Sequence, residues 1–466
     1  MAEETARVVV VGAGAAGTLV SARLLDSAVR AGRRISVDLI DPARCTGRGL
    51  AYATADPRHL LNVPAGRMSA LPADGDDFVR WLSRRAGRPF DPGAYVPRGI
   101  YGSYLVDVLR RSVDAAEGIA TLHRRCTRVV AVGGTADADR VRLRLREGGT
   151  LDADAAVCAL GNLAPGRGWV PEGLWRSPCF VDDPWHPGAL DGIAGDRDVL
   201  LVGTGLTMCD VARTLCAPGR TVHAVSRQGL VPLPHAVAAP VGAPAVAPGP
   251  VPAHGDLAQM RREVLRRAAQ YRRQHGDWRP AIDELRPHVT EMWQRLSSAD
   301  RERFLAGTLR EWEVSRHRLA PATDRALTES LRSERLTVRA AEVIAARAGE
   351  NGRSVTVNLS DGRSITVGTV VNCVGTEGRT RELADPLVRS LLDSGTAVPG
   401  PQGLGLDTTA EGRLVPAAGR PAAPVWTLGQ LRRGNLWETT AVPEIRVQAV
   451  ELADVILDRV HASLSV

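Results

Sequence analysis

The chain has 466 residues, which is longer than one ordinary domain and suits two or three domains. Its 59 basic residues are all arginines, and the lack of lysine excludes a lysine Schiff base and the lysine of a phosphate-binding P-loop. The arginines that produce the net charge of +7 are spread along the chain among acidic residues. The charge therefore indicates anionic small molecules as partners rather than nucleic acid.

The sequence also lacks the signals of several other protein classes. No run of about 18 apolar residues predicts a membrane span, and the acidic start at Met1–Glu4 differs from a signal peptide, so we expect a cytoplasmic protein. The seven cysteines include no Cys-x-x-Cys pair, which argues against a dithiol redox site, a zinc ribbon and an iron–sulfur cluster. We therefore predict no metal site, and a homo-oligomer is compatible with the composition.

The first recognisable unit is a strand, a glycine-rich turn, a helix and a second strand. An apolar strand over 7–11 runs into Gly-Ala-Gly-Ala-Ala-Gly at 12–17, the helix covers 16–31, and the next strand over 35–41 ends in an aspartate. Such glycines permit a tight turn, backbone amides close to a pyrophosphate, and close helix–strand packing, while the acid suits a ribose hydroxyl. The pattern predicts a dinucleotide site made by Gly12, Gly14, Ala15, Ala16, Gly17 and Asp41.

A second unit of the same kind begins at residue 198. Its strand over 198–202 leads into Gly-Thr-Gly-Leu-Thr-Met, in which Met208 replaces the third glycine, and the next strand over 221–225 is followed by a serine and an arginine. The missing acid and the guanidinium favour the extra phosphate of NADPH over NADH, although a degenerate turn beside a surface arginine would look alike. The predicted contacts are Gly203, Gly205, Leu206, Thr207, Ser226 and Arg227.

The rest of the chain adds an insertion and a few regular elements. Residues 232–254 are rich in Pro, Ala, Gly and Val and predict a loop, whereas 256–318 has a helical pattern, so we assign 232–330 to a loop and helical insertion. A hairpin is predicted around Asp361-Gly362, and a helix over 442–457. Together the elements predict an α/β fold with two Rossmann-like dinucleotide-binding domains and a helical insertion.

Several short segments give the chain a family resemblance. They are Gly47–Tyr52, His59–Met68, Pro97–Gly102, Arg316–Arg318 and Gly434–Thr440. On these segments and the two glycine turns, it resembles the bacterial FAD/NAD(P)-binding oxidoreductases that are related to class B flavin-dependent monooxygenases. The resemblance extends over nearly the whole chain, but Gly429-Gln430 stands where many flavoproteins have Gly-Asp.

The resemblance implies how two cofactors are held. FAD would be bound by residues 1–165 together with 370–466, and NADPH by residues 166–369. A helix that starts near Thr440 would point its N-terminus at the flavin, where it stabilises negative charge. Two apolar strands that end in glycine would carry the chain between the domains. The glycines expected at the cofactors are Gly161, Gly375 and Gly429.

Three side chains are candidates for a catalytic role. Asn62 either hydrogen-bonds the flavin or a pyridine ring, or it forms a turn before Pro64. Arg316 and His317, with Arg318, either anchor a substrate carboxylate or the nicotinamide phosphates, or form a solvated charged face.

The resemblance also implies an activity. It predicts an NADPH- and O2-dependent monooxygenase that oxygenates a small amine or amino acid at nitrogen, with the flavin carrying the redox chemistry. One alternative is an NADPH-dependent flavin reductase or dehydrogenase that inserts no oxygen. The other is a flavin-binding sensor or interaction protein.

Overall fold

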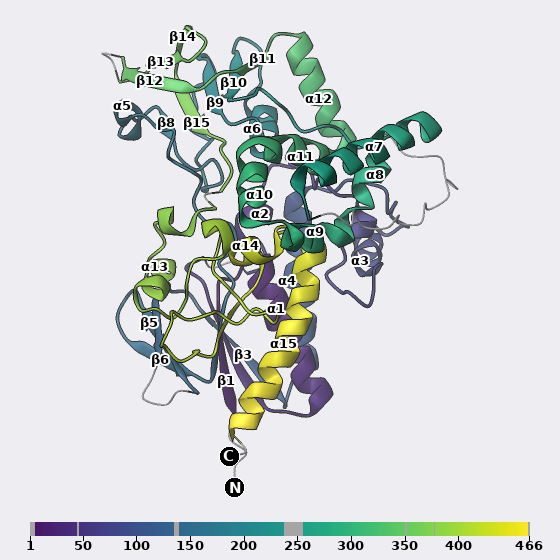
Figure 1. Cartoon of the computed structure of the whole chain (residues 1–466), viewed down its shortest axis with the longest axis vertical. Coiled ribbons are helices and arrows are strands. Elements are labelled where there is room, and N and C mark those ends of the chain that lie inside the picture. Colours follow the sequence, from purple (N-terminus) through teal and green to yellow (C-terminus); the bar gives the residue numbers. More distant parts are fainter. Residues whose placement is uncertain are drawn as a thin grey trace.

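Two parallel sheets of five strands each organise the protein in this computed structural model, and four strands of each follow the same order (Figure 1). The predicted pair of Rossmann-like domains is therefore confirmed. The structure describes residues 5–43, 46–134, 139–236, 255–349, 352–376 and 378–464.

The first sheet belongs to the first domain and has the order β16-β7-β1-β2-β3, with all neighbours parallel. Helix α1 (Ala15–Ala31) connects β1 to β2 and ends at Gly32, whose φ of 65° is the left-handed conformation that glycine adopts easily. Helices α4 and α15 pack beside α1 over the sheet (Figure 1). The bounds are β1 (Ala6–Val11), β2 (Ile35–Ile40), β3 (Ala120–Arg125), β7 (Ala155–Cys158), β16 (Val425–Thr427), α4 (Arg98–Ala115) and α15 (Val442–Leu464).

The second sheet has the order β11-β10-β9-β15-β8, again all parallel. Helix α6 connects β9 to β10 as α1 connects β1 to β2, so the two domains are structural twins. In both sheets the strand order reverses next to the strand that precedes the glycine turn, which is where such folds bind ligands. The bounds are β8 (Phe180–Val181), β9 (Val199–Val202), β10 (Val222–Ser226), β11 (Leu336–Ala340), β15 (Thr369–Asn372), α6 (Leu206–Leu215) and α12 (Pro321–Arg332).

Each domain also carries a three-stranded antiparallel sheet, which lies between β3 and β7 along the chain in the first domain and between β11 and β15 in the second. The second of these contains the hairpin that Asp361-Gly362 predicts, and Gly362 has a φ of 83°. The bounds are β4 (Val129–Gly134), β5 (Val141–Leu145), β6 (Thr150–Ala153), β12 (Val343–Ala348), β13 (Val355–Leu359) and β14 (Ser364–Val367).

The helical insertion lies between β10 and β11, as predicted, and packs against the segment that leads to α15 (Figure 1). Its own apolar core includes Met260, Ile282 and Trp293, and the indole Nε1 of Trp293 donates to the Gly434 carbonyl oxygen over 2.7 Å. Most of the predicted loop at 232–254 falls outside the described residues. The helices are α7 (Leu257–His275), α8 (Arg279–Asp283), η2 (Arg286–His288), α9 (Val289–Arg295), α10 (Ser298–Arg303), the π-helical turn η3 (Phe304–Thr308) and α11 (Leu309–Arg316).

Short helices complete the connections. They are α2 (Gly49–Tyr52), η1 (Ala65–Arg67), α3 (Asp77–Ala86), α5 (Glu172–Trp175), η4 (Thr380–Glu382), α13 (Pro386–Asp393), η5 (Pro401–Gly403), η6 (Gly429–Arg432) and α14 (Arg433–Leu436).

One predicted domain boundary is wrong by a few residues. Strand β15 at 369–372 pairs with β9 and β8, so the chain returns to the first domain after this strand rather than at residue 370.

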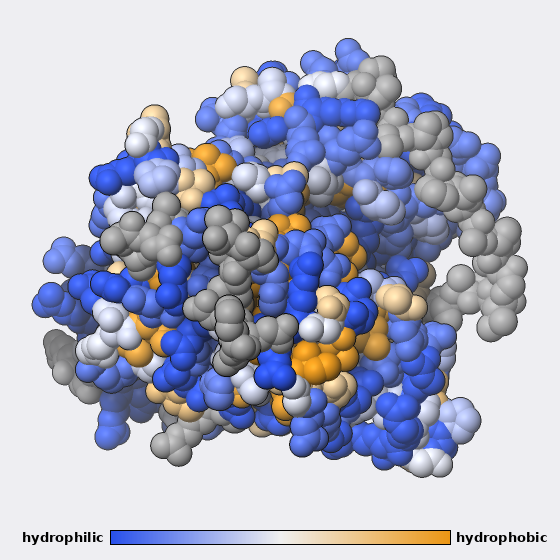
Figure 2. Space-filling view, turned by 90° about the horizontal axis from the view of Figure 1, so that it is seen from below, coloured by the Kyte–Doolittle hydropathy of each residue, from blue (hydrophilic) through white to orange (hydrophobic). Residues whose placement is uncertain are grey.

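The surface seen from below is largely hydrophilic with smaller apolar patches (Figure 2). Among the described helices, none combines the length and apolar character that crossing a bilayer requires.

Candidate functional site

The first glycine turn joins β1 to α1 in a geometry that only glycine permits. Gly12 has a φ of 100°, and a Cβ there would lie 2.3 Å from the Ala159 carbonyl oxygen at the end of β7. A Cβ on Gly17 would lie 1.7 Å from the Gly12 carbonyl oxygen. These two glycines therefore let the turn, the helix and the neighbouring strand pack against one another, as predicted from the sequence.

The open side of this turn suits a pyrophosphate. A Cβ on Gly14 would meet no atom closer than 3.5 Å, and no side chain caps the N-terminus of α1. The amides of its first turn are thus free for an anion, helped by the helix dipole. Asp41 lies at the same turn, because its carboxylate accepts hydrogen bonds from the amides of Ala13 (2.8 Å) and Ala43 (2.7 Å). These residues fit the diphosphate and ribose of FAD.

Three more predicted glycines surround the crevices without being needed for packing. A Cβ on Gly161 or on Gly375 would meet no atom within 4 Å, and one on Gly429 none closer than 3.8 Å. Gly161 and Gly429 also have φ values of 63° and 71°. Their open surroundings leave room for a cofactor against the backbone.

The segment before α15 is held in place by a buried glutamine. Gln448 accepts from the Gly429 amide (3.2 Å) and donates to the Thr439 hydroxyl (2.8 Å). Helix α15 then starts at Val442, two residues after the exposed Thr440, so its N-terminus is close to where the resemblance puts it. The site of the missing acid is occupied by Gln430, whose buried amide donates to the Thr376 hydroxyl over 3.4 Å.

The second glycine turn repeats the geometry of the first. Gly203 has a φ of 104°, and its Cβ would lie 2.5 Å from the Cys373 carbonyl oxygen at the end of β15. Gly205 precedes α6 with φ and ψ of −79° and −167°, close to the −71° and −166° of Gly14. The side chain of Met208 fills the place of the third glycine and is fully buried. This crevice therefore suits a second pyrophosphate.

Charge around the second turn is positive. Arg310 of α11 reaches across the turn and donates to the carbonyl oxygens of Thr204 (3.0 Å) and Leu230 (2.7 Å). The Ser226 hydroxyl bonds to that of Thr204 over 2.8 Å, which ties the end of β10 to the turn. Arg227 follows it, is exposed, and has no recorded partner among the described residues. A free guanidinium here suits the 2′-phosphate of NADPH.

The predicted catalytic residues Arg316 and His317 lie where the insertion meets the segment before α15. The Arg316 guanidinium pairs with Glu438 at 2.8 Å, and both side chains are 11% exposed. Burial raises the pKa of Glu438 against the lowering effect of Arg316. One carboxylate oxygen of Glu438 and the Nε of Arg316 are buried and have no hydrogen-bond partner among the residues that the structure describes. The hydrogen-bonding capacity of the pair is thus incompletely used by the protein itself.

His317 adds no positive charge beside Arg316. Burial, followed by the positive charge of surrounding arginines, lowers the pKa of His317 to about 3, so the imidazole is neutral at neutral pH. Arg318 is separate from this site, because it is fully buried and pairs with Asp283. The arginines near His317 are Arg316, Arg433, Arg286 and Arg310.

Asn62 lies at the junction between the first domain and the insertion. Its carbonyl oxygen accepts from the Nε2 of His235 over 2.8 Å, and burial lowers the pKa of His235 to about 4. The Asn62 side chain itself has no recorded hydrogen bond within the described residues and is partly exposed. Both roles that the sequence allows for this side chain, a cofactor contact and a turn, stay predictions.

Two buried polar contacts fix the domains to each other. Arg98 at the start of α4 pairs with Asp210 of α6 at 2.8 Å, and their side chains are 17% and 5% exposed. His59 bonds through Nε2 to the Asp210 carbonyl oxygen (3.1 Å) and to the Thr214 hydroxyl (2.9 Å). The helix that follows the second turn is therefore held against the first domain.

The cysteines near the two crevices are not arranged for dithiol chemistry. Among the described residues, all cysteines are free. Burial raises the pKa of Cys158, at the end of β7, to about 12, and also raises the pKa of Cys373 after β15. Since the thiolate is the reactive form, neither residue is poised for disulfide exchange.

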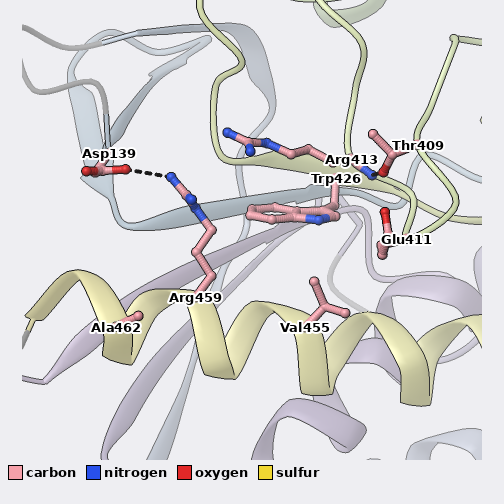
Figure 3. A pocket seen from close by; sticks show the side chains of 8 residues that line it. All are labelled: Asp139, Thr409, Glu411, Arg413, Trp426, Val455, Arg459 and Ala462. Atoms are coloured by element: carbon pink, nitrogen blue, oxygen red, sulfur yellow. Dashed lines mark hydrogen bonds and ion pairs between the residues drawn. The ribbon is translucent and has the colours of Figure 1, made fainter.

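A separate hollow lies against α15 and β16 (Figure 3). Its two arginines are already engaged, because Arg459 pairs with Asp139 at 2.6 Å and Arg413 donates to the Ala422 and Ala423 carbonyl oxygens. None of its lining residues belongs to a glycine turn. In the described part of the chain, no three His, Cys, Asp or Glu side chains gather as metal ligands.

Comparison with known families identifies the first crevice. Residues 9–163 match the family described as FAD-NAD(P)-binding. Over these residues the chain is similar to that family. The cofactor prediction is confirmed at the level of FAD and a nicotinamide dinucleotide. No curated protein matches the chain by sequence.

Solved structures share the whole fold. The ornithine N-hydroxylase KtzI of Kutzneria sp. 744 has a TM-score of 0.65 at 16% identity, covering 98% of this chain and 100% of its own. The L-lysine 6-monooxygenase of Pseudomonas syringae has a TM-score of 0.64 at 17% identity, with the same coverage. The bacillithiol disulfide reductase of Staphylococcus aureus has a TM-score of 0.56 at 13% identity, covering 98% and 99%. At these identities, the likeness shows a common fold.

Proposed function

We propose that this protein is an FAD-dependent, NADPH-using monooxygenase that oxygenates the nitrogen of a small amine or amino acid. The observation that carries the proposal is the pair of similar crevices. One lies in the part that matches the FAD-NAD(P)-binding family, and the other lies beside Arg227, which has no partner among the described residues. Two enzymes with this fold are named as an ornithine N-hydroxylase and an L-lysine 6-monooxygenase. Both names support an amine as the substrate.

The residues around the first crevice would bind FAD. The amides of Ala15, Ala16 and Gly17 would hold the diphosphate and Asp41 the adjacent ribose, while the N-terminus of α15 would stabilise negative charge on the flavin. When bound, FAD supplies the redox chemistry, because it takes a hydride from NADPH and passes electrons to oxygen. The protein supplies orientation and keeps water out.

The second crevice would bind NADPH. The first-turn amides of α6 and the guanidinium of Arg310 would hold its pyrophosphate, and Arg227 its 2′-phosphate. Because Arg98 and Asp210 hold α6 against the first domain, the nicotinamide would be delivered toward the flavin from a fixed direction.

The substrate would lie where Arg316 and Glu438 meet the neutral His317. A buried carboxylate with one free oxygen suits an ammonium group, and the surrounding arginines suit a carboxylate. His317 would stay uncharged at neutral pH, so it would add no positive charge that repels the ammonium group. The net reaction would be R–NH2 + O2 + NADPH + H+ giving R–NHOH + H2O + NADP+.

A flavin reductase that inserts no oxygen is the second candidate, because a disulfide reductase also shares the fold. The buried thiols at the crevices argue against the disulfide branch of that class, since their pKa values are raised.

Oxygen and NADPH consumption, with detection of hydroxylamines, distinguishes the candidates. The FAD-loaded protein would be incubated with NADPH, oxygen and a panel of amino acids and amines. We expect one panel member to increase NADPH oxidation and to yield an equimolar N-hydroxylated product. Hydrogen peroxide as the only oxygen product, with every panel member unchanged, would contradict the proposal and favour a reductase or oxidase.

A further inference from the structure

One helix of the insertion, α11, connects the second glycine turn with the proposed substrate site. It carries three charged side chains at every third residue, which are Arg310, Glu313 and Arg316. Side chains three residues apart are neighbours on the surface of a helix, so these three lie on the same side of α11. The first contacts the turn before α6, and the last contacts the segment before α15. The middle residue, Glu313, therefore lies between the two sites.

Glu313 lies between two guanidinium groups. One oxygen of its carboxylate accepts a hydrogen bond from Nη1 of Arg310 over 3.3 Å, and the other oxygen lies 3.9 Å from Nη2 of Arg433 in α14. The side chains of Arg310, Glu313 and Arg433 are 25%, 33% and 23% exposed, so solvent reaches all three. Ion pairs at this exposure are weak and exchange partners at little cost. Glu313 can thus strengthen its contact with one arginine when it loses the other.

Arg310 is the arginine that a dinucleotide would take. Its Nη2 donates to the carbonyl oxygens of Thr204 and Leu230, which fixes the guanidinium beside the turn. Its Nη1, which bonds to Glu313, would lie 4.0 Å from a Cβ on Gly205. Gly205 directly precedes α6, whose N-terminus has no side-chain cap. A pyrophosphate at this helix start offers more charge and more acceptor oxygens than a carboxylate, so it competes with Glu313 for Nη1.

Arg433 acts on the segment that carries the other end of the site. Its guanidinium carbon lies 4.6 Å from the centre of the Trp437 ring, within the range of a cation–π contact. Trp437 has a φ of 63° and a ψ of −74°, which a bulky residue adopts only when its surroundings hold it there. The next residue is Glu438, the partner of Arg316. A closer pair between Glu313 and Arg433 would therefore hold Glu438 more firmly.

We propose that Glu313 is a positioning residue that couples dinucleotide binding to the substrate site. A pyrophosphate at the second turn takes Arg310 from Glu313, and the released carboxylate moves to Arg433. The segment that carries Glu438 is then held in place while the dinucleotide is bound. The inference rests on the proposed function, because it takes the second crevice to be a dinucleotide site. Such coupling is reciprocal, so a change at Arg433 alters the affinity for the dinucleotide.

Two ligands that differ in the pyrophosphate test this coupling. NADP+ contains a pyrophosphate, whereas 2′-AMP carries the phosphate expected at Arg227 but no pyrophosphate. Both would be titrated calorimetrically into the FAD-loaded protein, where neither is turned over. Arg433→Gln should weaken NADP+ binding about two- to fivefold, because the pair that forms on binding is lost. It should leave 2′-AMP binding unchanged, since this ligand does not take Arg310 from Glu313.

The same substitution in a second background isolates the role of Glu313. In Glu313→Gln the carboxylate that moves between the arginines is absent, so adding Arg433→Gln should no longer weaken NADP+ binding. Arg261→Gln is the matched control, because it breaks the exposed pair of Arg261 with Glu311 on the same helix. It should leave NADP+ affinity unchanged in both backgrounds.

Hydrogen exchange of the backbone amides at 433–440 provides a second measurement. NADP+ should slow the exchange of these amides about two- to fivefold in the unmodified protein, and 2′-AMP should not. The slowing should disappear in Glu313→Gln although NADP+ still binds. Slowing that persists in Glu313→Gln would show that the dinucleotide contacts the segment directly, which would overturn the role of Glu313.

Three titration results would also overturn the inference. They are an unchanged NADP+ affinity in Arg433→Gln, equal weakening with and without Glu313, and equal weakening of NADP+ and 2′-AMP. Circular dichroism and FAD content confirm that each variant is folded. Absence of saturable NADP+ binding to the unmodified protein would overturn the proposed function and this inference with it. Normal NADP+ binding without the coupling would overturn the inference alone.

Discussion

Burial, and after it the charge of four nearby arginines, lowers the pKa of His317 and keeps its imidazole neutral, which has a consequence for acid stability. Its pKa in the folded protein is about 3, below the ordinary value of 6.5. As the pH falls below 6.5, the unfolded chain takes up a proton that the folded protein refuses until about pH 3. Stability that is fully present above pH 6.5 is therefore lost across this window.

The substitution His317→Gln tests this linkage. It removes the titrating group, so the free energy of unfolding should fall less between pH 7 and pH 5, by at most about 2 kcal/mol. Urea denaturation at both pH values measures the change. His186→Gln, at an exposed histidine, is the matched control. If both variants keep the pH dependence of the unmodified protein, then His317 is not the neutral group that we describe.

Arg227 should decide the choice between the two nicotinamide dinucleotides. In Arg227→Ala, the KM for NADPH should rise about ten- to a hundredfold, because a charge-assisted contact to the 2′-phosphate is lost. The KM for NADH should stay within about twofold, since NADH lacks this phosphate. Arg325→Ala removes another exposed arginine of the second domain and should change neither value. Equal losses with both dinucleotides would place Arg227 elsewhere than at the phosphate.

At the scale of elements, the strand–turn–helix units were the most predictable part of the molecule. Each unit is specified by consecutive residues, because the turn after the strand requires a positive φ, which Gly12 and Gly203 adopt. The hairpin at Asp361-Gly362 and the final helix follow from equally local signals.

Contacts between elements were not predictable in the same way. Arg310 lies 106 residues from Thr204, and Glu438 lies 122 residues from Arg316, so no spacing in the sequence connects them. Glu438 fell within a segment quoted for the family resemblance, but nothing local indicated its ion pair. The role of Gln448 in bracing the segment before α15 also depends on tertiary packing.

Gly14 provides a test that separates folding from cofactor binding. Its Cβ would fit within the protein, with the nearest atom at 3.5 Å, and its φ of −71° suits any residue. Gly14→Ala should therefore fold normally but bind FAD at least about tenfold more weakly, because the added methyl group enters the space for the diphosphate. Fluorescence titration with FAD measures the change, and Gly75→Ala, with no atom within 4 Å, is the control. Unchanged FAD affinity in Gly14→Ala would contradict the assignment of this crevice.

At the scale of the whole molecule, two domains whose sheets share the order of four strands are joined by the ion pair of Arg98 and Asp210. The sequence predicted both domains, yet it set the second boundary too early, because β15 reads as a buried strand that either sheet could accept. The junction itself, made by Arg98, Asp210 and His59, depends on residues far apart in the chain. It gives the two crevices the fixed relation that electron transfer between cofactors needs.

Anaerobic mixing of the FAD-loaded protein with NADPH tests this central claim most directly. The flavin absorbance bleaches only if both crevices are occupied and NADPH transfers a hydride to the flavin. The account predicts that one NADPH per FAD bleaches the oxidised flavin band, and that NADH does so more slowly. A protein that retains no added FAD, or whose bound flavin stays oxidised in excess NADPH, would contradict it.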